Sequence, residues 1–353
     1  MSQRIVIMAG GTGGHIFPAL AVAKYLKQQG WMVSWVGTKR GMESRVIPEN
    51  NIEIDWLSVG GIRGKGLTAK INSLWQLINS FAQVFSIFRL RKPDVVLGFG
   101  GYVAGPGGLM AKLMGIPLVI HEQNRVPGTT NRLLANKANK IMEAFPESFP
   151  KHKKAVFTGN PLRTDFLNVA KKEFWTKADA RAFRILVVGG SQGAKILNDV
   201  IPGTVKQLSN VEVRHQTGTA AFEQVAKKYV ELSINAEVVA FINDIAAAYQ
   251  WADMVICRAG AMTISEVAAV GLPAVFIPLP HAIDDHQTAN AKYLTEAGAG
   301  ILLAQNDLNE SSLLTAINEI KQSLNEMSMA SKNKAKLDAT EVVADICAKE
   351  AKK

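Results

Sequence analysis

The fold is decided by two similar stretches, Arg4-Ile-Val-Ile-Met-Ala-Gly-Gly-Thr-Gly-Gly14 and Phe183-Arg-Ile-Leu-Val-Val-Gly-Gly-Ser-Gln-Gly193. Each is a short β-branched run that ends in glycines. Helical apolar spacing follows both, over about residues 16–29 and up to about residue 208. Strand, glycine loop and helix in this order open a βαβ unit. Their return after about 180 residues predicts two similar doubly wound domains.

Further β-branched runs extend both halves into α/β domains with a parallel sheet and helices on both faces. They are residues 31–36, 94–97 and 118–120 in the first half, and 211–215, 237–240, 254–257 and 274–277 in the second. The length of 353 residues fits two domains of about 150 residues. We place the boundary near Gly159-Asn-Pro161, giving domains 1–160 and 161–328, and we expect a Lys-rich helix over 329–352 to join the first domain.

The charge is spread unevenly over a composition that is ordinary for a globular protein, with 48% apolar and 20% charged residues. Residues 1–160 hold 20 Lys and Arg against 8 Asp and Glu, whereas residues 161–353 hold 20 against 22. A basic half indicates a polyanionic partner: nucleic acid, anionic lipid or a phosphorylated ligand. Two cysteines form no disulfide framework, and neither a signal peptide nor an apolar run of about 18 residues is evident, so we expect a cytoplasmic protein.

Four glycine loops follow predicted strands, where backbone amides can approach a phosphate. They are Gly10–Gly14, the pair Gly98–Gly101 and Gly105–Gly108, Gly189–Gly193, and Arg258–Ala261. Any one of them could serve only tight packing of strand against helix, but four are harder to explain in this way. The opening loops lack the G-x-G-x-x-G spacing of dinucleotide sites, and no G-x-x-x-x-G-K-[ST] motif occurs. These facts disfavour an NAD(P) oxidoreductase and P-loop phosphoryl transfer.

Ionisable residues stand beside the loops of the first half. His15 follows Gly14 at a helix start, where the helix dipole favours a neutral imidazole that could accept a proton from a hydroxyl. The alternative is that it caps or positions the helix. His121-Glu-Gln-Asn124 ends an apolar strand, so these polar groups are placed either as site residues or as loop caps.

The second half offers weaker signals. Glu266 could accept two ribose hydroxyls, or it could form a capping box with Thr263. Asp284-Asp-His-Gln287 could bind hydroxyls and is poor evidence for a metal site. Arg163 could contact a phosphate or remain solvated.

Residues 67–90 predict a helix with an unusually wide apolar face and basic residues at its ends. Such a helix can cover the sheet, bind a membrane interface, or do both. Nucleic acid is a weaker candidate partner, because no base-stacking pattern or recognition motif accompanies the charge. The membrane-binding candidates are Ile71, Trp75, Ile78, Phe81, Arg89, Arg91 and Lys92.

Six motifs taken together resemble one family. In chain order they are residues 10–19, 100–108, 121–124, 159–163, 189–194 and 258–266. Their order and spacing resemble the MurG family of GT-B glycosyltransferases over nearly the whole chain. The resemblance implies two Rossmann-like domains facing across a cleft. It also implies inverting transfer of GlcNAc from UDP-GlcNAc to the C4 hydroxyl of MurNAc in lipid I, giving lipid II and UDP without a metal or other cofactor.

The resemblance also implies roles for residues. His15 is the candidate catalytic base and Glu122 competes with it. The implied donor-binding residues are Thr12, Gly13, Gly14, Asn124, Arg163, Gly190, Ser191, Gln192, Asn198, Ile242, Ala261, Met262, Thr263, Ile264, Ser265, Glu266 and Gln287. The implied acceptor-binding residues are Gly13, Gly14, His15, Tyr102, Gly105, Gly107, Gly108 and Asn131.

The expected setting is peripheral, on the cytoplasmic face of the cell inner membrane. There the basic first half would meet anionic phospholipid and the lipid-linked diphosphate. The resemblance further implies roles in cell shape and division, with cell-wall synthesis and division proteins as possible partners. Two alternatives stay open: a UDP-GlcNAc 2-epimerase-like enzyme of the same fold, and a non-catalytic, membrane-peripheral nucleotide-binding protein.

Overall fold

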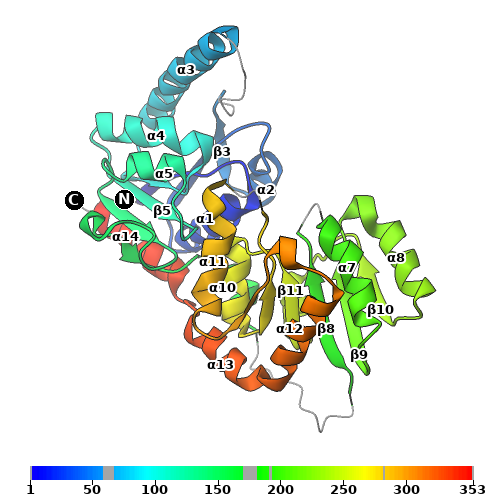
Figure 1. The fold of residues 1–353 in the computed structure, drawn as a ribbon. Helices are drawn as coiled ribbons and strands as arrows, with labels where there is room; N and C mark the ends of the chain where they lie inside the picture. The colour runs from blue at the N-terminus through cyan, green and yellow to red at the C-terminus, as the bar shows by residue number, and fades with distance from the viewer. Residues whose placement is uncertain (1, 59–66, 170–180, 191–192, 281–282, 352–353) are drawn as a thin grey trace. The chain divides into compact units, whose positions relative to one another are not determined.

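The computed structural model describes residues 2–58, 67–169, 181–190, 193–280 and 283–351, with side chains of the helix that begins at 67 described from residue 78. The chain forms two compact units (Figure 1). The first contains Met1–Arg163 and Lys336–Lys353, and the second contains Thr164–Ala335. The chain therefore leaves the first domain once and returns to it near its end.

The first domain is a seven-stranded parallel sheet in the order β3-β2-β1-β4-β5-β6-β7. The strands are β1 (Arg4–Met8), β2 (Met32–Gly37), β3 (Glu53–Trp56), β4 (Val95–Gly98), β5 (Leu118–Glu122), β6 (Lys140–Glu143) and β7 (Val156–Phe157). The helices are α1 (Gly13–Gln28), α2 (Glu43–Glu49), α3 (Leu67–Arg91), α4 (Gly101–Leu113), α5 (Thr129–Leu134) and α14 (Ala339–Ala351), with a 3-10 turn at Lys151–Lys153.

Both faces of this sheet are covered, as a doubly wound fold requires. Successive residues of a strand point to opposite faces. Ile5 and Ile7 of β1 accordingly pack with α1 and α14, whereas Val6 and Met8 pack with α3 and α4. This division of the apolar residues explains why β1 is apolar from Ile5 to Met8 and lies in the interior of the sheet, between β2 and β4.

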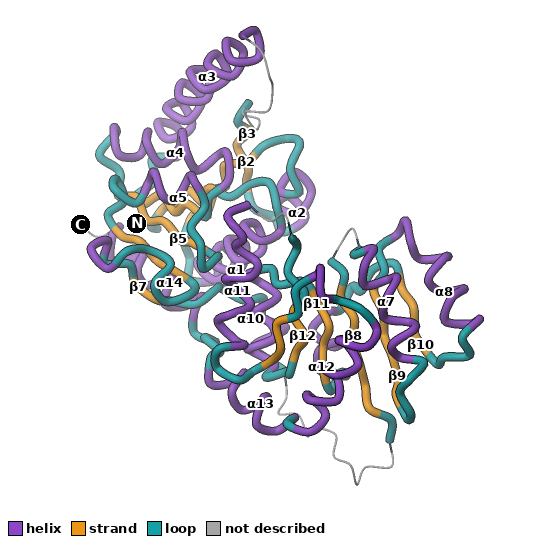
Figure 2. Tube along the Cα trace, in the orientation of Figure 1, coloured by secondary structure: helices purple, strands orange, loops and turns teal. Residues whose placement is uncertain are grey.

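The second domain is a six-stranded parallel sheet in the order β10-β9-β8-β11-β12-β13. The strands are β8 (Phe183–Val188), β9 (Val211–Gln216), β10 (Ala236–Val239), β11 (Met254–Cys257), β12 (Ala274–Phe276) and β13 (Gly300–Leu302). The α-helices are α6 (Thr164–Leu167), α7 (Lys195–Val205), α8 (Phe222–Glu231), α9 (Ile245–Trp251), α10 (Ala261–Val270), α11 (His286–Thr295), α12 (Glu310–Gln322) and α13 (Leu324–Asn333). The 3-10 turns are Thr219–Ala221, Ile283–Asp285 and Gln305–Asp307. Figure 2 shows the strands flanked by helices.

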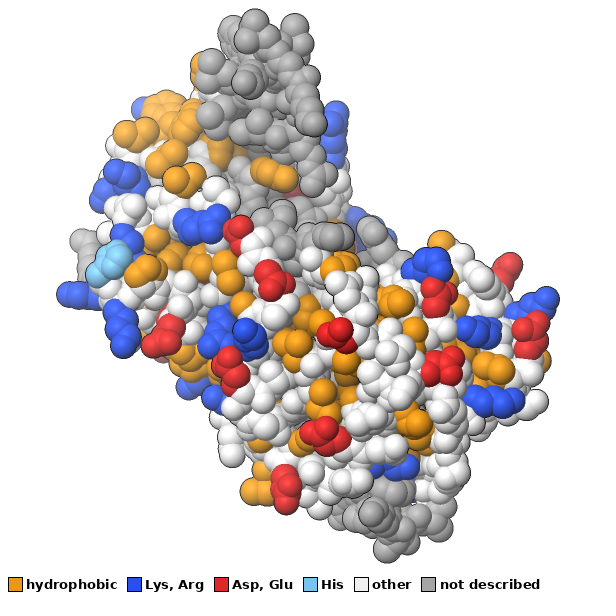
Figure 3. Space-filling model, viewed as in Figure 1, with side chains coloured by type: hydrophobic (Ala, Val, Ile, Leu, Met, Phe, Trp, Pro, Cys, Tyr) orange, Lys and Arg blue, Asp and Glu red, His pale blue; other side chains and the backbone are white. Residues whose placement is uncertain are grey.

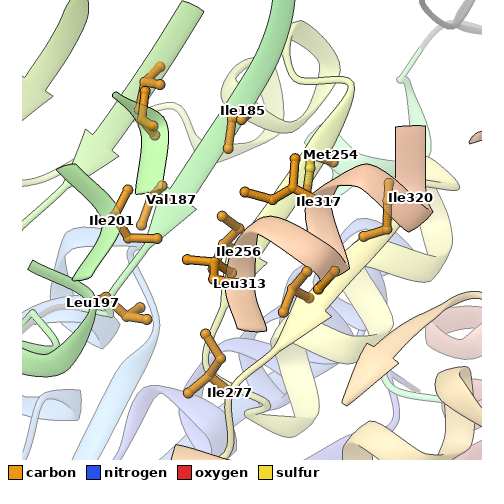
Figure 4. Packing of buried hydrophobic residues seen from close by; sticks show 14 of the residues in the cluster. Ile185, Val187, Leu197, Ile201, Met254, Ile256, Ile277, Leu313, Ile317 and Ile320 are labelled. Atoms are coloured by element: carbon orange, nitrogen blue, oxygen red, sulfur yellow. The ribbon is translucent and has the colours of Figure 1, made fainter. Parts of the chain in front are cut away.

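The core of the second domain lies between β8, β11 and β12 on one side and α7 and α12 on the other. Figure 4 shows Ile185, Val187 and Ile256 of the strands facing Leu197 of α7 and Leu313 of α12. All five side chains are inaccessible to solvent. This packing fixes the strand ends from which the glycine loops of the second domain leave.

The observed strands confirm two doubly wound α/β domains and show four strands that the sequence did not reveal: β3, β6, β7 and β13. These are short, and β3, β7 and β13 lie at sheet edges. The single helix expected over 329–352 is wrong, because α13 ends at Asn333 and α14 begins at Ala339. The helix is interrupted where the chain crosses between domains: α13 packs on α10 of the second domain, and α14 packs on α1 of the first.

Candidate active site

Polar groups of the first domain gather at the carboxyl edge of its sheet. Here β1, β4 and β5 end, and the helices α1 and α4 begin at Gly13 and Gly101. The loops after β1 and β4 touch, since a Cβ on Gly101 would lie 2.6 Å from the carbonyl oxygen of Gly10. Gly101 also has a φ of +78°, which a residue with a side chain adopts at a cost. Two helix N-termini with their unpaired amides are therefore held at this edge.

His15 lies in the first turn of α1 and is partly exposed. Its Nδ1 is 2.6 Å from Oε1 of Gln123, which follows β5. The N-cap position is Thr12, whose carbonyl accepts the first hydrogen bonds of the helix from the amides of His15 and Ile16. The alternative that His15 caps the helix is therefore wrong, and its imidazole is oriented by a side chain from another strand.

The motif His121–Asn124 supplies the groups beneath His15. His121 and Gln123 are buried, and Gln123 Nε2 lies 3.0 Å from Nδ1 of His121 and 2.7 Å from its carbonyl oxygen. His121 Nε2 lies 3.0 Å from the carbonyl oxygen of Gly159. Burial lowers the pKa of His121 to about 4, because the charged imidazolium loses its solvation. His121 is therefore neutral near pH 7.

Glu122 is buried and its carboxylate is used by the protein itself. Oε1 accepts hydrogen bonds from the backbone N and Nδ2 of Asn124 at 2.9 and 3.2 Å. Oε2 accepts from the backbone N of Gly128 and from Nδ2 of Asn131 at 3.0 and 2.9 Å. These four donors occupy the usual acceptor directions of a carboxylate. Glu122 thus holds the loop between β5 and α5, and Asn131 is a buried partner of that loop.

Glu43 is a residue of this site that the sequence did not reveal. It is fully buried at the start of α2. One carboxylate oxygen accepts from the backbone N and Oγ1 of Thr38, at 2.9 and 2.8 Å, and the other accepts from the backbone N of Gly11 at 3.1 Å. Glu43 therefore ties the loop after β2 to the loop Gly10–Gly14. A single sequence gives little signal of this role, because the contact joins residues 32 positions apart.

The glycines of α4 differ in what surrounds them. A Cβ on Gly105 would have Thr130 at 3.9 Å as its nearest neighbour, so the backbone there is accessible. A Cβ on Gly107 would overlap Met8 Sδ, and one on Gly108 would come within 2.8 Å of Leu134. The lack of a side chain at Gly107 and Gly108 therefore serves helix packing, and their place in acceptor binding stays a prediction. Tyr102, on the first turn, is 54% exposed.

The glycine loop after β8 in the second domain contacts residues at the end of β9. Gln216 Nε2 donates to the carbonyl of Gly190 at 2.8 Å, and Asn198 Nδ2 of α7 donates to the carbonyl of Thr217 at 3.1 Å. Gly193 lies so close to Thr217 that a Cβ would overlap its carbonyl oxygen. Ser191 and Gln192, two of the predicted donor-binding residues, lie outside the described residues. Gln216 is a further supporting residue that the sequence did not single out.

The helix α10 presents part of the predicted donor set on one side. Its N-cap is Gly260, and Met262, Thr263, Ser265 and Glu266 are partly exposed. The capping-box alternative for Thr263 and Glu266 is wrong, because the helix has already begun at Ala261. Two other predicted donor-binding side chains are buried in the domain core, which corrects any side-chain role for them: Ala261 and Ile264.

Neighbouring loops hold the rest of the set. Arg258 Nη1 donates to the carbonyls of Ile277 and Pro278 at 3.1 and 3.2 Å, so this arginine braces the chain after β12. Gln287 Oε1 accepts from the backbone N of Leu279 at 2.9 Å. Ile242 is partly exposed after β10. Among the described residues, no three His, Cys, Asp or Glu side chains come together as metal ligands would.

Arg163 and Asn124, which were predicted to reach the donor, both belong to the first domain. The guanidinium carbon of Arg163 lies 5.7 Å from the ring centroid of Phe17 on α1, one turn of chain beyond Gly13 and Gly14. Its charge is therefore placed beside the N-terminal turns of α1.

A second surface of the first domain combines apolar and basic side chains. Val84 and Phe88 of α3 are buried against the sheet, while Ile78 and Phe85 of the same helix are exposed and Phe81 is partly exposed. One side of α3 therefore packs on the sheet and another side is apolar and exposed, and binding of that exposed side to a membrane stays a prediction. Exposed leucines continue the apolar surface onto α4 and α5: Leu109, Leu113 and Leu133. Figure 3 shows apolar side chains gathered over the α3 and α4 region with Lys and Arg nearby.

The basic residues at the end of α3 are not equivalent. Arg89 and Lys92 are exposed, but the Arg91 guanidinium pairs with Asp55 and Glu53. The hydrogen bond to Asp55 raises the pKa of Arg91. Its charge is neutralised within the domain, which corrects its place among the membrane-binding candidates. Ile71 and Trp75 lie outside the described side chains, and no helix in the described part of the chain is long and apolar enough to cross a bilayer.

Comparison with known proteins gives consistent matches over both domains. Residues 5–143 match the glycosyltransferase family 28 N-terminal domain, and residues 184–346 match the C-terminal domain of the same family. A Methylococcus capsulatus protein named UDP-N-acetylglucosamine–N-acetylmuramyl-(pentapeptide) pyrophosphoryl-undecaprenol N-acetylglucosamine transferase is 52% identical over 99% of both chains. The crystal structure of Acinetobacter baumannii MurG, 41% identical, superimposes with a TM-score of 0.84 over 98% of this chain and 99% of that one.

The chain belongs to the MurG family of glycosyltransferases. A similarly named Shewanella frigidimarina protein is 47% identical and covers 100% of this chain and 98% of its own length. The UDP-GlcNAc 2-epimerase of Neisseria meningitidis shares only 13% identity at a TM-score of 0.67, which shows a shared fold alone. Membership of the MurG family therefore disfavours the epimerase, the oxidoreductase and the non-catalytic alternatives.

Proposed function

We propose that this MurG-family chain transfers GlcNAc from UDP-GlcNAc to the C4 hydroxyl of MurNAc in lipid I, giving lipid II and UDP. The observation that carries the proposal is the match to N-acetylglucosamine transferases along the full chain, combined with the partly exposed His15, which Gln123 orients at the carboxyl edge of the first sheet. The acceptor binds the first domain and the donor binds the second.

His15 acts as the base in a single displacement. The C4 oxygen attacks the anomeric carbon, the C4 proton passes to the imidazole, and the electron pair of the broken C1–O bond leaves with the β-phosphate of UDP. His15 is partly exposed in the first turn of α1, and its imidazole is oriented by Gln123. Glu122 is disfavoured as the base because four donors from the protein already occupy its carboxylate.

Backbone amides at helix N-termini bind the phosphates. In the first domain, Gly13, Gly14 and the accessible Gly105 face the loop edge, with Thr12 and Tyr102 beside them, and they receive the lipid-linked diphosphate. In the second domain, the loop after β8 and the first turn of α10 receive the UDP diphosphate. These amides stabilise the charge that develops on the leaving UDP, and the proposal requires no metal ion or cofactor.

The partly exposed side chains around α10 recognise the nucleotide. Glu266 accepts the ribose hydroxyls, Met262 and Ile242 flank the uracil, and Thr263 contacts a phosphate. Gln287, Asn198, Ser191 and Gln192 complete the donor set from the second domain. Support for this assignment is that Met262, Thr263 and Glu266 share the accessible side of one helix.

The apolar and basic surface of the first domain binds the cytoplasmic face of the membrane. Ile78, Phe85 and Leu113 enter the interface, and Arg89 and Lys92 attract anionic phospholipid. Peripheral binding brings the enzyme to its lipid-linked acceptor. It also places the enzyme where proteins of cell-wall synthesis and division work, and these are its proposed protein partners.

The test is a product assay with labelled UDP-GlcNAc, first with lipid I and then without an acceptor. We expect labelled lipid II and UDP in the first case, and unchanged UDP-GlcNAc in the second. UDP-ManNAc formed without an acceptor would indicate an epimerase. Binding of UDP-GlcNAc with no turnover on lipid I would indicate a non-catalytic protein.

A further inference from the structure

A chain of hydrogen bonds joins His15 to the backbone of Gly159 through Gln123 and His121. We propose that Gln123 and His121 are positioning residues that hold His15 in one tautomer, with the proton on Nδ1 and the lone pair on Nε2. The catalytic meaning of this tautomer rests on the proposed function, in which His15 accepts the C4 proton. The tautomer itself follows from the hydrogen bonds and from the burial of His121.

The direction of donation along these hydrogen bonds is fixed, because the series starts at a carbonyl oxygen, which can only accept. The carbonyl oxygen of Gly159 lies 3.0 Å from Nε2 of His121, so this nitrogen carries a proton. The Thr158 hydroxyl, 3.2 Å from the same nitrogen, donates its own proton to the Gly159 carbonyl at 3.0 Å. His121 is fully buried and its pKa is lowered to about 4, so the ring is neutral near pH 7. Its Nδ1 therefore carries a lone pair.

The same reasoning fixes the amide of Gln123. The nearest groups at one end of this amide are Nδ1 of His121, at 3.0 Å, and the carbonyl oxygen of His121, at 2.7 Å, and both are acceptors. The NH2 group must occupy that end, which leaves Oε1 facing His15. The backbone of Gln123 is held in turn by Nδ2 of Asn160, which donates to its carbonyl at 3.1 Å.

An amide oxygen only accepts, so the 2.6 Å contact requires a proton on Nδ1 of His15. In a neutral ring the other nitrogen, Nε2, then has the lone pair that a general base needs. An amide orients the ring without adding a negative charge. A carboxylate at this place would favour the imidazolium and would make the neutral base scarcer near pH 7.

The experiment compares the full-length protein with its Gln123→Met variant, which keeps a side chain of similar length and loses both polar groups. Long-range proton–nitrogen correlation spectra of histidine-labelled protein report which ring nitrogen is protonated, and the His15→Ala spectrum assigns the His15 signals. We expect Nδ1 of His15 to be protonated in the wild type, and a shift toward protonated Nε2 in Gln123→Met. Protonated Nε2 in the wild type, or the same tautomer in both proteins, would overturn the proposal.

Kinetics supply the second readout. We expect Gln123→Met to lower kcat about 10- to 100-fold, a part of what a general base contributes, with the KM for UDP-GlcNAc within about twofold. In the His15→Ala background the same substitution should change kcat less than about twofold. An equal loss in both backgrounds would mean that Gln123 acts on the fold and not on His15, and would refute the proposal.

Two controls separate the possible failures. Gln207→Met makes the same chemical change at an exposed position of the second domain and should leave kcat and the melting temperature unchanged. If His15→Ala retains near-normal turnover, the assignment of His15 as the base in the proposed function fails, and with it the catalytic role of Gln123 and His121. The spectra test the chain of hydrogen bonds from His15 to Gly159 in either case, so the two failures are distinguishable.

Discussion

Replacing Glu122 with Gln tests whether this carboxylate builds the site or performs the chemistry. In the structure, two donors converge on each of its oxygens. A glutamine must turn its NH2 toward one of these pairs, and two hydrogen bonds become donor–donor contacts in a buried place. Hydrogen bonds to a charged group are worth about 1.5–3 kcal/mol each. The substitution should therefore lower the free energy of unfolding of the first domain by about 3–6 kcal/mol.

Such a loss is large against the about 5–15 kcal/mol that stabilises a typical domain. We would measure it by urea unfolding, together with hydrogen exchange of the amides of residues 124–131, which should lose protection first. Glu147→Gln is the matched control in the same domain, because Glu147 is exposed and its pair with Lys151 spans 4.0 Å. An exposed pair of this kind contributes about 0–1 kcal/mol, so the control should unfold as the wild type does.

The opposite outcome would refute this reasoning. If Glu122→Gln unfolds at the wild-type urea concentration and keeps its KM values, while kcat falls by orders of magnitude, the carboxylate acts on the reacting atoms. Glu122 would then replace His15 as the base.

Three further changes have contrasting expected effects. Gly107→Ala should destabilise the first domain by about 1–3 kcal/mol in unfolding experiments, because its Cβ overlaps Met8, whereas Gly105→Ala should leave stability unchanged and raise the KM for lipid I; equal effects would contradict the assignment. Replacing Arg89 and Lys92 with Gln should weaken binding to anionic vesicles about 10-fold or more, at about 1 kcal/mol per charge, with unchanged UDP-GlcNAc affinity; loss of both would indicate a role in folding. His121 is protonated in the unfolded chain between pH 6.5 and 5, but not in the native state, where its pKa is about 4. The free energy of unfolding should therefore fall by about 1.5 kcal/mol over this pH range. His121→Asn should reduce this pH dependence in urea unfolding, and an unchanged pH dependence would contradict the assignment.

The sequence was sufficient for features that depend on local pattern. Both glycine-ended strands, β1 and β8, were predicted within a residue, because a buried central strand is continuously apolar and its loop is marked by glycines. His15 was placed correctly at the start of a helix for the same reason. The short strand β7 has only two residues, too few for any period to show.

Features that depend on contacts distant in sequence were not predictable. Gln123 meets His15 across 108 positions, and only the order of the strands in the sheet brings them together. The sequence predicts that Arg91 is a free basic residue, yet the pairing of β2 with β3 places Asp55 beside it. The sequence predicts that Gly107 belongs to a ligand-binding loop. Its close contact with Met8 depends on how α4 crosses β1, which the sequence does not show.

The most direct measurement is the single-turnover rate of GlcNAc transfer from UDP-GlcNAc to lipid I, with both substrates saturating, for the wild type and for His15→Ala. General base catalysis contributes about 10²–10⁴-fold to such a step. We therefore expect labelled lipid II to form at least about 100-fold more slowly in the variant, with unchanged UDP-GlcNAc affinity and an unchanged melting temperature. Transfer by His15→Ala at close to the wild-type rate would contradict the assignment of His15 as the base.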